Sequence, residues 1–140
     1  MSSPAHDIAL ELDDEGFGAF AADSGWSISA AQEPSEPPTT ITVFDTASES
    51  IYEDLDFTQA RFQVRVRGPS YPDAYAKQQA MRSFLVKEIN FTRSGFLYMG
   101  IDMLGQIELI GRDDDNRYVL VANYRLYRKP EEVILPIEEP

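Results

Sequence analysis

The chain has 140 residues, 43% of them hydrophobic and 26% charged, which is the composition of one globular domain with its own core. Its 24 acidic and 12 basic residues give a net charge of −12, which argues against the basic footprint of a nucleic-acid-binding protein. It has no cysteine, hence no disulfide or thiolate metal ligand, and no apolar run of membrane-spanning length, so we expect no membrane partner.

Charge is distributed unevenly along the sequence. Residues 1–60 contain 13 acids and no lysine or arginine, residues 61–130 contain 7 acids and all 12 basic residues, and the last ten residues add four glutamates. Two interpretations remain open. The acidic head and tail could neutralise the basic body within one chain. Alternatively, opposite faces could meet head-to-tail between subunits, which closes into a ring or continues as a tube.

The N-terminal segment predicts one short amphipathic helix. Asp7 is a suitable N-cap, Ile8 and Leu12 lie four residues apart, and Gly16 follows the acidic run Asp13–Glu15. We therefore expect a helix over about 7–16.

The next forty residues contain more turns than regular structure. Residues 23–40 contain Gly25, Pro34, Pro37 and Pro38 with several serines and threonines, and one possible strand at WSISA. The β-branched run TTITVF predicts a strand over 39–44. The acidic, turn-rich residues 45–58 predict a surface loop.

Residues 61–67 alternate between polar and apolar side chains. Phe62, Val64 and Val66 share one face, and the opposite face carries Arg61, Gln63, Arg65 and Arg67. A period of two predicts a half-buried strand.

A helix is predicted directly after this strand. Ser70 and Asp73 form a capping box with Pro72 in the first turn, so the helix would run over about 71–89. Ala74, Gln78, Met81 and Leu85 lie along one stripe of this helix, flanked by Phe84 and Ile89.

The remaining sequence predicts three strands, over 96–101, 106–110 and 117–127. The last two are joined by the hairpin loop GRDDDN, residues 111–116. We therefore predict an α+β fold: a largely antiparallel, mixed sheet of about four to six strands, a short N-terminal helix and one long helix packed on one face.

Few residues could carry catalytic or metal chemistry. His6 is the only histidine, so histidine-based nucleophilic and metal sites are not expected. The acidic run 113–116 lacks the glycine and the distal glutamate of a calcium-binding loop. Asp54 and Asp56 have no evident partner for acid–base work. We predict no enzyme activity, no cofactor and no metal.

Three fragments resemble the phage tail terminator family, whose members are also described as minor capsid or tail completion proteins of long-tailed phages. They are DIALELDDEGFGAF, FQVRVRGPSYPDAYAKQQAMRSFL and LIGRDDDNRYVLVANYRLYR, in that order. The resemblance implies a single domain over residues 1–129. Residues 130–140, with the apolar run VILPI between glutamate pairs, lie outside it as a tail or arm. Asn116 stands where the family pattern has a glycine before arginine, and the segment before the hairpin lacks the Ser-Pro of that pattern.

The resemblance implies a structural virion protein of the tail or neck, assembled in the host cytoplasm. It would form a sixfold ring that caps the head-proximal end of the tail tube, ends tube growth and joins the neck. Its partners would be other copies of itself, the tube protein and the connector, with DNA passing through the lumen without specific binding. A head-completion ring, or a small enzyme or ligand-binding domain, remains as an alternative.

Two groups of residues follow as candidates for these surfaces. An acidic lumen would repel passing DNA, and its candidates are Asp13, Asp14, Glu15, Glu53, Asp54 and Asp56. Arginine pairs bidentately with carboxylates and so can fix orientation at a junction. The candidates for subunit and partner contacts are Arg61, Arg65, Arg67, Arg112, Asp113, Asp114 and Arg117. The carboxylates that meet the 61–67 arginines could lie in the same chain or on the next subunit.

Overall fold

The computed structural model describes residues 3–52, 57–87 and 90–131, and for residues 47–52 it describes the backbone alone. Two helices and seven strands follow one another along the chain. They are α1 (Pro4–Asp14), β1 (Ala19–Phe20), β2 (Ser27–Ala30), β3 (Thr40–Tyr52), β4 (Phe57–Gly68), α2 (Tyr71–Lys87), β5 (Phe91–Arg93), β6 (Phe96–Arg112) and β7 (Tyr118–Pro130).

All seven strands form one mixed sheet in the order β1-β2-β3-β4-β7-β6-β5. The β1–β2 and β2–β3 pairs are parallel, and the other neighbours are antiparallel. The sheet therefore has more strands than the four to six that the sequence predicts. Two of the strands, β1 and β5, contain only two and three residues, too few to show a period in the sequence.

The prediction of a surface loop over 45–58 is wrong. β3 continues to Tyr52 and β4 begins at Phe57, with Ser50 opposite Gln59 and Ile51 opposite Thr58. The pairing shifts register between Asp45 and Ala47 and again between Ala47 and Ser50. These irregularities, together with the acidic composition, removed the alternation by which a strand is detected.

The two strands predicted over 96–101 and 106–110 are one strand, β6. Gly105 has a φ of +79°, and the register of β6 on β7 shifts between Leu104 and Glu108. A glycine at positive φ can mark a bulge as well as a turn. Here it bends a continuous strand.

Helix α1 begins earlier than its sequence predicts. Ser3 is the N-cap and accepts a hydrogen bond from the backbone N–H of His6 at 3.2 Å, while Pro4 occupies the first turn. Asp7 is therefore inside the helix, where it is fully buried. The His6 ring contacts the edge of the Phe20 ring, with centroids 5.6 Å apart.

The predicted alternation of β4 and the predicted stripe of α2 are confirmed. Phe62, Val64 and Val66 are fully buried, and α2 buries the four residues predicted, Ala74, Gln78, Met81 and Leu85. The Gln78 side chain donates to the backbone carbonyls of Val64 at 2.8 Å and Leu120 at 3.0 Å. These bonds attach α2 to β4 and β7.

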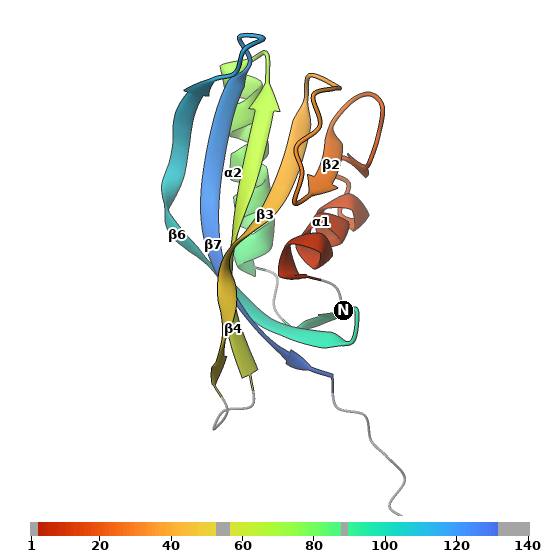
Figure 1. The fold of residues 1–140 in the computed structure, drawn as a ribbon, viewed down its shortest axis with the longest axis vertical. Helices are drawn as coiled ribbons and strands as arrows, with labels where there is room; N and C mark the ends of the chain where they lie inside the picture. The colour runs from red at the N-terminus through yellow and green to blue at the C-terminus, as the bar shows by residue number, and fades with distance from the viewer. Residues whose placement is uncertain (1–2, 53–56, 88–89, 132–140) are drawn as a thin grey trace, which may run out of the picture.

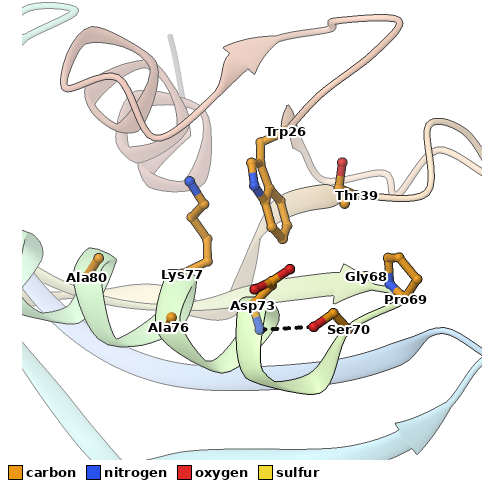
Figure 2. A pocket seen from close by; sticks show the side chains of 9 residues that line it. All are labelled: Trp26, Thr39, Gly68, Pro69, Ser70, Asp73, Ala76, Lys77 and Ala80. Carbon is orange, nitrogen blue, oxygen red and sulfur yellow. Dashed lines mark hydrogen bonds between the residues drawn. The ribbon is translucent and has the colours of Figure 1, made fainter.

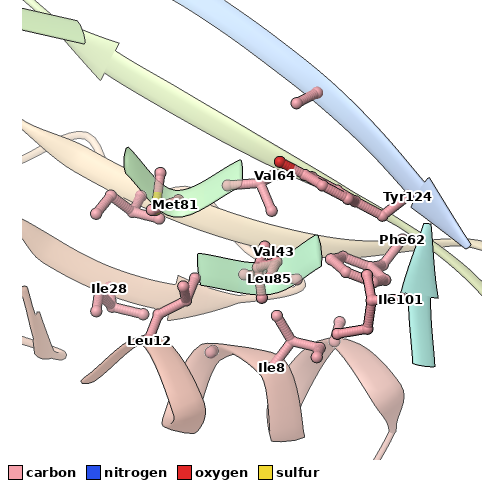
Figure 3. Packing of buried hydrophobic residues seen from close by; sticks show 14 of the residues in the cluster. Ile8, Leu12, Ile28, Val43, Phe62, Val64, Met81, Leu85, Ile101 and Tyr124 are labelled. Carbon is pink, nitrogen blue, oxygen red and sulfur yellow. The ribbon is translucent and has the colours of Figure 1, made fainter. Parts of the chain in front are cut away.

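Both helices contribute to one hydrophobic cluster. Ile8 and Leu12 of α1 meet Ile28 and Val43, and Leu85 of α2 belongs to the same cluster (Figure 3). The far ends of β3 and β4 extend past both helices, as Figure 1 shows. Because Phe62, Val64 and Val66 of β4 point into this cluster, the alternate residues Arg61, Arg65 and Arg67 lie on the opposite face of the strand.

Candidate assembly surface

Two β4 arginines share one carboxylate from the loop between β2 and β3. Arg65 Nε lies 2.9 Å from Glu33 Oε2, and Arg67 Nη1 lies 3.3 Å from Glu33 Oε1. Arg67 also donates to the backbone carbonyl of Pro37 at 2.9 Å. Only 5% of the Arg67 side chain is exposed, against 30% of that of Arg65. The carboxylate that these arginines meet therefore belongs to the same chain.

The hairpin between β6 and β7 joins this group through Arg117. Arg117 donates to Asp113 Oδ2 at 2.8 Å, to Asp115 Oδ2 at 3.0 Å and to the backbone carbonyl of Ser35 at 3.1 Å. Asp113 Oδ2 also lies 3.8 Å from Arg67 Nε. We name Arg65, Arg67, Arg117, Glu33 and Asp113 the arginine cluster. It ties the 31–39 loop and the hairpin to one end of the sheet.

Burial and charge shift two pKa values in this cluster. Burial lowers the pKa of the Arg67 guanidinium, an effect that Glu33 opposes and that the neighbouring charge of Arg117 reinforces. Burial alone would raise the pKa of Asp113, but hydrogen bonds from the backbone and side chain of Arg117, and its positive charge, hold it below its ordinary value of 3.8. Asp113 is therefore ionised at neutral pH, as its ion pair with Arg117 requires.

The remaining predicted contact residues stay on the surface. Arg61 is exposed, opposite Ala47 and Arg125 in the sheet. Arg112 is exposed and stacks on the Tyr118 ring, 4.3 Å from its centroid, and Asp114 is exposed in the hairpin. Four of the seven predicted residues thus lie in the arginine cluster, and these three face solvent.

Of the predicted acidic residues at the end of α1, one forms an ion pair, one is half-buried and one is exposed. Asp14 forms an ion pair with Arg93, which also lies 2.7 Å from Glu11 Oε1. Asp13 is half-buried and accepts from the backbone N–H of Phe20 at 3.4 Å, whereas Glu15 is exposed. Glu53, Asp54 and Asp56 lie outside the described residues.

A buried polar group around Asp7 was missed by the sequence reasoning. Asp7 accepts from Ser94 Oγ at 2.7 Å and from the hydroxyl of Tyr98, and Arg128 Nη1 lies 3.6 Å from Asp7 Oδ2. Burial, together with the hydrogen bond to Asp7, raises the pKa of Tyr98 above its ordinary value. The group links α1 to the β5–β6 turn and to β7. The residue type at position 7 suits an N-cap equally well, so the sequence held no signal for the buried role.

Strand β6 exposes apolar side chains near the hairpin. About half of the surface of each of Leu109 and Ile110 is exposed, 49% and 52% respectively. β5 pairs with Phe96–Tyr98 alone, so within the described chain the rest of β6 is hydrogen-bonded on its β7 side and open on the other. Open strand edges with apolar side chains are surfaces that other chains pair with.

The cavity in Figure 2 lies between the start of α2 and Trp26 and measures about 390 Å³. Its one basic group, Lys77, donates to the backbone carbonyl of Phe17 at 3.0 Å and lies 5.0 Å from the Trp26 ring centroid. Burial lowers the pKa of Lys77. Ser70 and Asp73 cap the helix there, with the Asp73 N–H donating to Ser70 Oγ at 3.4 Å. These groups are explained by helix capping and packing.

Within 3–52, 57–87 and 90–131 there is no group of three or more histidine, cysteine or acidic residues placed to hold a metal ion. The helices in this part of the chain are too short or too polar to span a membrane.

Comparison with known proteins gives a family and a fold. The family model described as bacteriophage tail terminator protein matches residues 11–129. A solved structure titled as the virion of a native gene transfer agent particle aligns with a TM-score of 0.55 and 15% identity, over 72% of this chain and 77% of the other, so the two share a fold. A second structure, at 13% identity over 77% of this chain and 81% of the other, has a TM-score of 0.48, too low to carry an argument. Among curated proteins, no sequence match was found. The family match covers most of the chain, and the chain belongs to the bacteriophage tail terminator family, a family of structural proteins of the virion tail.

Proposed function

We propose that this chain forms a ring, of six copies, that caps the head-proximal end of the phage tail tube. The ring ends tube polymerisation and offers its other face to the neck or connector protein. The observation that carries this proposal is the family match over residues 11–129, which spans every described helix and strand except residues 4–10 of α1 and the last residue of β7.

The distribution of charge in the structure supports a rigid subunit. The arginine cluster and the Arg93 pairs join residues from the acidic head to residues of the basic body within one chain. Because these arginines are occupied, they fix the loop and hairpin at one end of the sheet and leave Arg61, Arg112 and Asp114 available for contacts. A ring of identical head-to-tail contacts requires that each subunit present its surfaces in one fixed geometry.

The open edge of β6 is the surface that we assign to the junction between subunits. Leu109 and Ile110 supply apolar area there, and Arg112 supplies a charge that Tyr118 holds in place by stacking. Apolar area excludes water at the centre of a contact, and a fixed charge at its rim sets the orientation of the partner.

The surplus of acid suits a channel for DNA. Glu15 is exposed at the end of α1, and Asp13 is half-buried beside it. Carboxylates that line a lumen repel phosphate over about 8 Å at physiological salt, so DNA would pass without being held. We place the end of α1 on the lumen side of the ring.

Tube length is the property to measure. Tail-tube protein of the same phage is polymerised with and without the purified chain, and lengths are measured by electron microscopy. We expect shorter tubes of narrow length distribution, each with added density at one end. Unchanged lengths, with no chain bound at either end, would overturn the proposal.

A further inference from the structure

A groove separates the C-terminal half of α2 from the middle of β6. It encloses about 660 Å³ and is lined by Arg82, Ser83, Val86, Lys87, Asp102 and Met103. We call it the α2–β6 groove. None of its lining residues belongs to the arginine cluster, and it does not include Leu109 or Ile110, the part of the β6 edge that the proposed function uses.

Two cations of the groove have no carboxylate partner in the described part of the chain. Six of the 12 basic residues form ion pairs there: Arg65, Arg67, Arg93, Arg117, Arg125 and Arg128. Arg82 and Lys87 are exposed and form none. The one acid that lines the groove, Asp102, pairs with Arg125 at 3.1 Å. In a chain with twice as many acids as bases, two cations in one groove that pair with no described carboxylate are available to an acidic ligand.

The groove also offers apolar surface and a strand edge. Val86 is 43% exposed and Met103 is half-buried. Asp102 and Met103 lie in the part of β6 whose second edge is open within the described residues. A ligand that suits these features is an extended peptide with apolar side chains in the middle and carboxylates at its ends, because such peptides add to open strand edges.

The chain itself contains such a peptide. The sequence EEVILPIEEP, residues 131–140, places five apolar residues between two pairs of glutamates. Its one internal proline, Pro136, is tolerated on an edge strand, where one side of the backbone needs no hydrogen bond. The four carboxylates match the two groove cations in sign.

The direction of β7 favours a groove on another copy over the chain's own groove. Asp102 and Met103 pair with Arg125 and Tyr124, and β7 then continues away from them to Pro130, opposite Phe96. The Glu131 N–H donates to the carbonyl of Gly95 at 2.8 Å, which fixes the exit at the β5–β6 turn. To reach its own groove the segment would have to reverse direction around β5.

We propose that residues 132–139 of one subunit bind as an added strand in the α2–β6 groove of a second copy. Val86 and Met103 contact the apolar run, and Arg82 and Lys87 pair with the flanking glutamates. This arm-in-groove contact adds to the ring of the proposed function, but it is a property of two copies of the chain and needs no tail tube.

Disulfide trapping tests the contact directly, because the chain contains no cysteine of its own. Full-length Val86→Cys protein is mixed with full-length protein that carries Val133→Cys, Leu135→Cys or Ile137→Cys, and the mixture is oxidised. Only a contact between two copies can link these single variants, and a disulfide forms only when the two Cα atoms come within about 7 Å. Gln79→Cys, on the exposed side of the same helix, is the matched control.

We expect at least one tail position to give linked heterodimers with Val86→Cys at about ten times the yield obtained with Gln79→Cys. Adding Arg82→Glu and Lys87→Glu to the Val86→Cys protein should lower that yield about tenfold, since two ion pairs become two repulsions. Equal yields for Val86→Cys and Gln79→Cys would overturn the proposal. A double variant that carries Val86→Cys and a tail cysteine in the same chain is a second test. If its disulfide forms solely within one chain, the proposal is also overturned. Capped tubes without this link would refute the arm alone, and the link without capped tubes would refute the proposed function alone.

Discussion

At the scale of single residues, Glu33 organises the outer face of β4. It binds both Arg65 and Arg67, although it lies in a loop with no motif around it. The sequence predicted that the β4 arginines would need carboxylates, but it could not say which ones. That choice depends on how the 31–39 loop folds over the sheet, a long-range arrangement with no local signal.

Replacing Glu33 by Gln should destabilise the monomer. Arg67 is almost fully buried, and a buried cation that loses a charged partner keeps its cost of desolvation. We expect a loss of about 2 kcal/mol in the free energy of unfolding, measured by urea denaturation. Glu36→Gln is the control, because the Glu36 side chain is 75% exposed and 4.0 Å from Arg117. An equal effect of both changes would contradict the role of Glu33.

Asp113 should make the stability of the monomer fall at acidic pH. Its pKa is lower in the folded protein than its ordinary value of 3.8, so the ionised form favours folding. This contribution is complete above that ordinary value and is lost as the pH falls through the folded pKa. Thermal unfolding at a series of pH values from about 5 to about 2 should therefore show a smaller loss of stability for Asp113→Asn than for the wild type. If the stability of the variant and of the wild type fell equally with pH, Asp113 would not be the residue responsible.

At the scale of elements, the regular patterns were predictable and the irregular ones were not. The alternation of β4 and the stripe of α2 follow directly from the sequence, because each buries one face against a single cluster. β3 and β6 contain register shifts, so their patterns change phase within one strand. β1 is held by its neighbour β2 rather than by its own two residues.

Adjacent positions of α2 should respond differently to truncation. Leu85 is fully buried, so Leu85→Ala should cost about 2–5 kcal/mol by leaving a cavity in the cluster. Val86 is exposed to 43%, so Val86→Ala should change the free energy of unfolding by less than about 0.5 kcal/mol. Chemical denaturation measures both values. Similar losses at the two positions would mean that α2 does not face the sheet as described.

The β6 edge should affect assembly without affecting folding. Ile110→Lys places a charge on exposed apolar surface, so the melting temperature should stay close to that of the wild type. Ring formation on tube ends, followed by electron microscopy, should be lost because the charge would be buried at the proposed junction. Gln79→Lys, an equal change of charge at an exposed site on α2, should assemble normally. Normal rings with Ile110→Lys would remove this edge from the junction.

At the scale of the whole molecule, the split charge of the sequence has a use within one chain. Glu11, Asp14 and Glu33 from the acidic first half pair with Arg65, Arg67 and Arg93 from the basic second half. In the described structure, the acidic and basic parts of the sequence therefore neutralise one another within a single subunit. Reversing Arg65 and Arg67 to Glu should consequently destabilise the monomer, rather than leave a folded subunit that fails to assemble.

The proposed cap is a ring of six copies, so the first quantity to measure is the number of copies at the end of a tail tube. Tubes of the same phage are incubated with the purified chain, and the capped ends are averaged from electron micrographs viewed along the tube axis. We expect a closed ring of six copies with an open centre, at one end of the tube. Single copies at the tip, or binding along the tube wall, would contradict it.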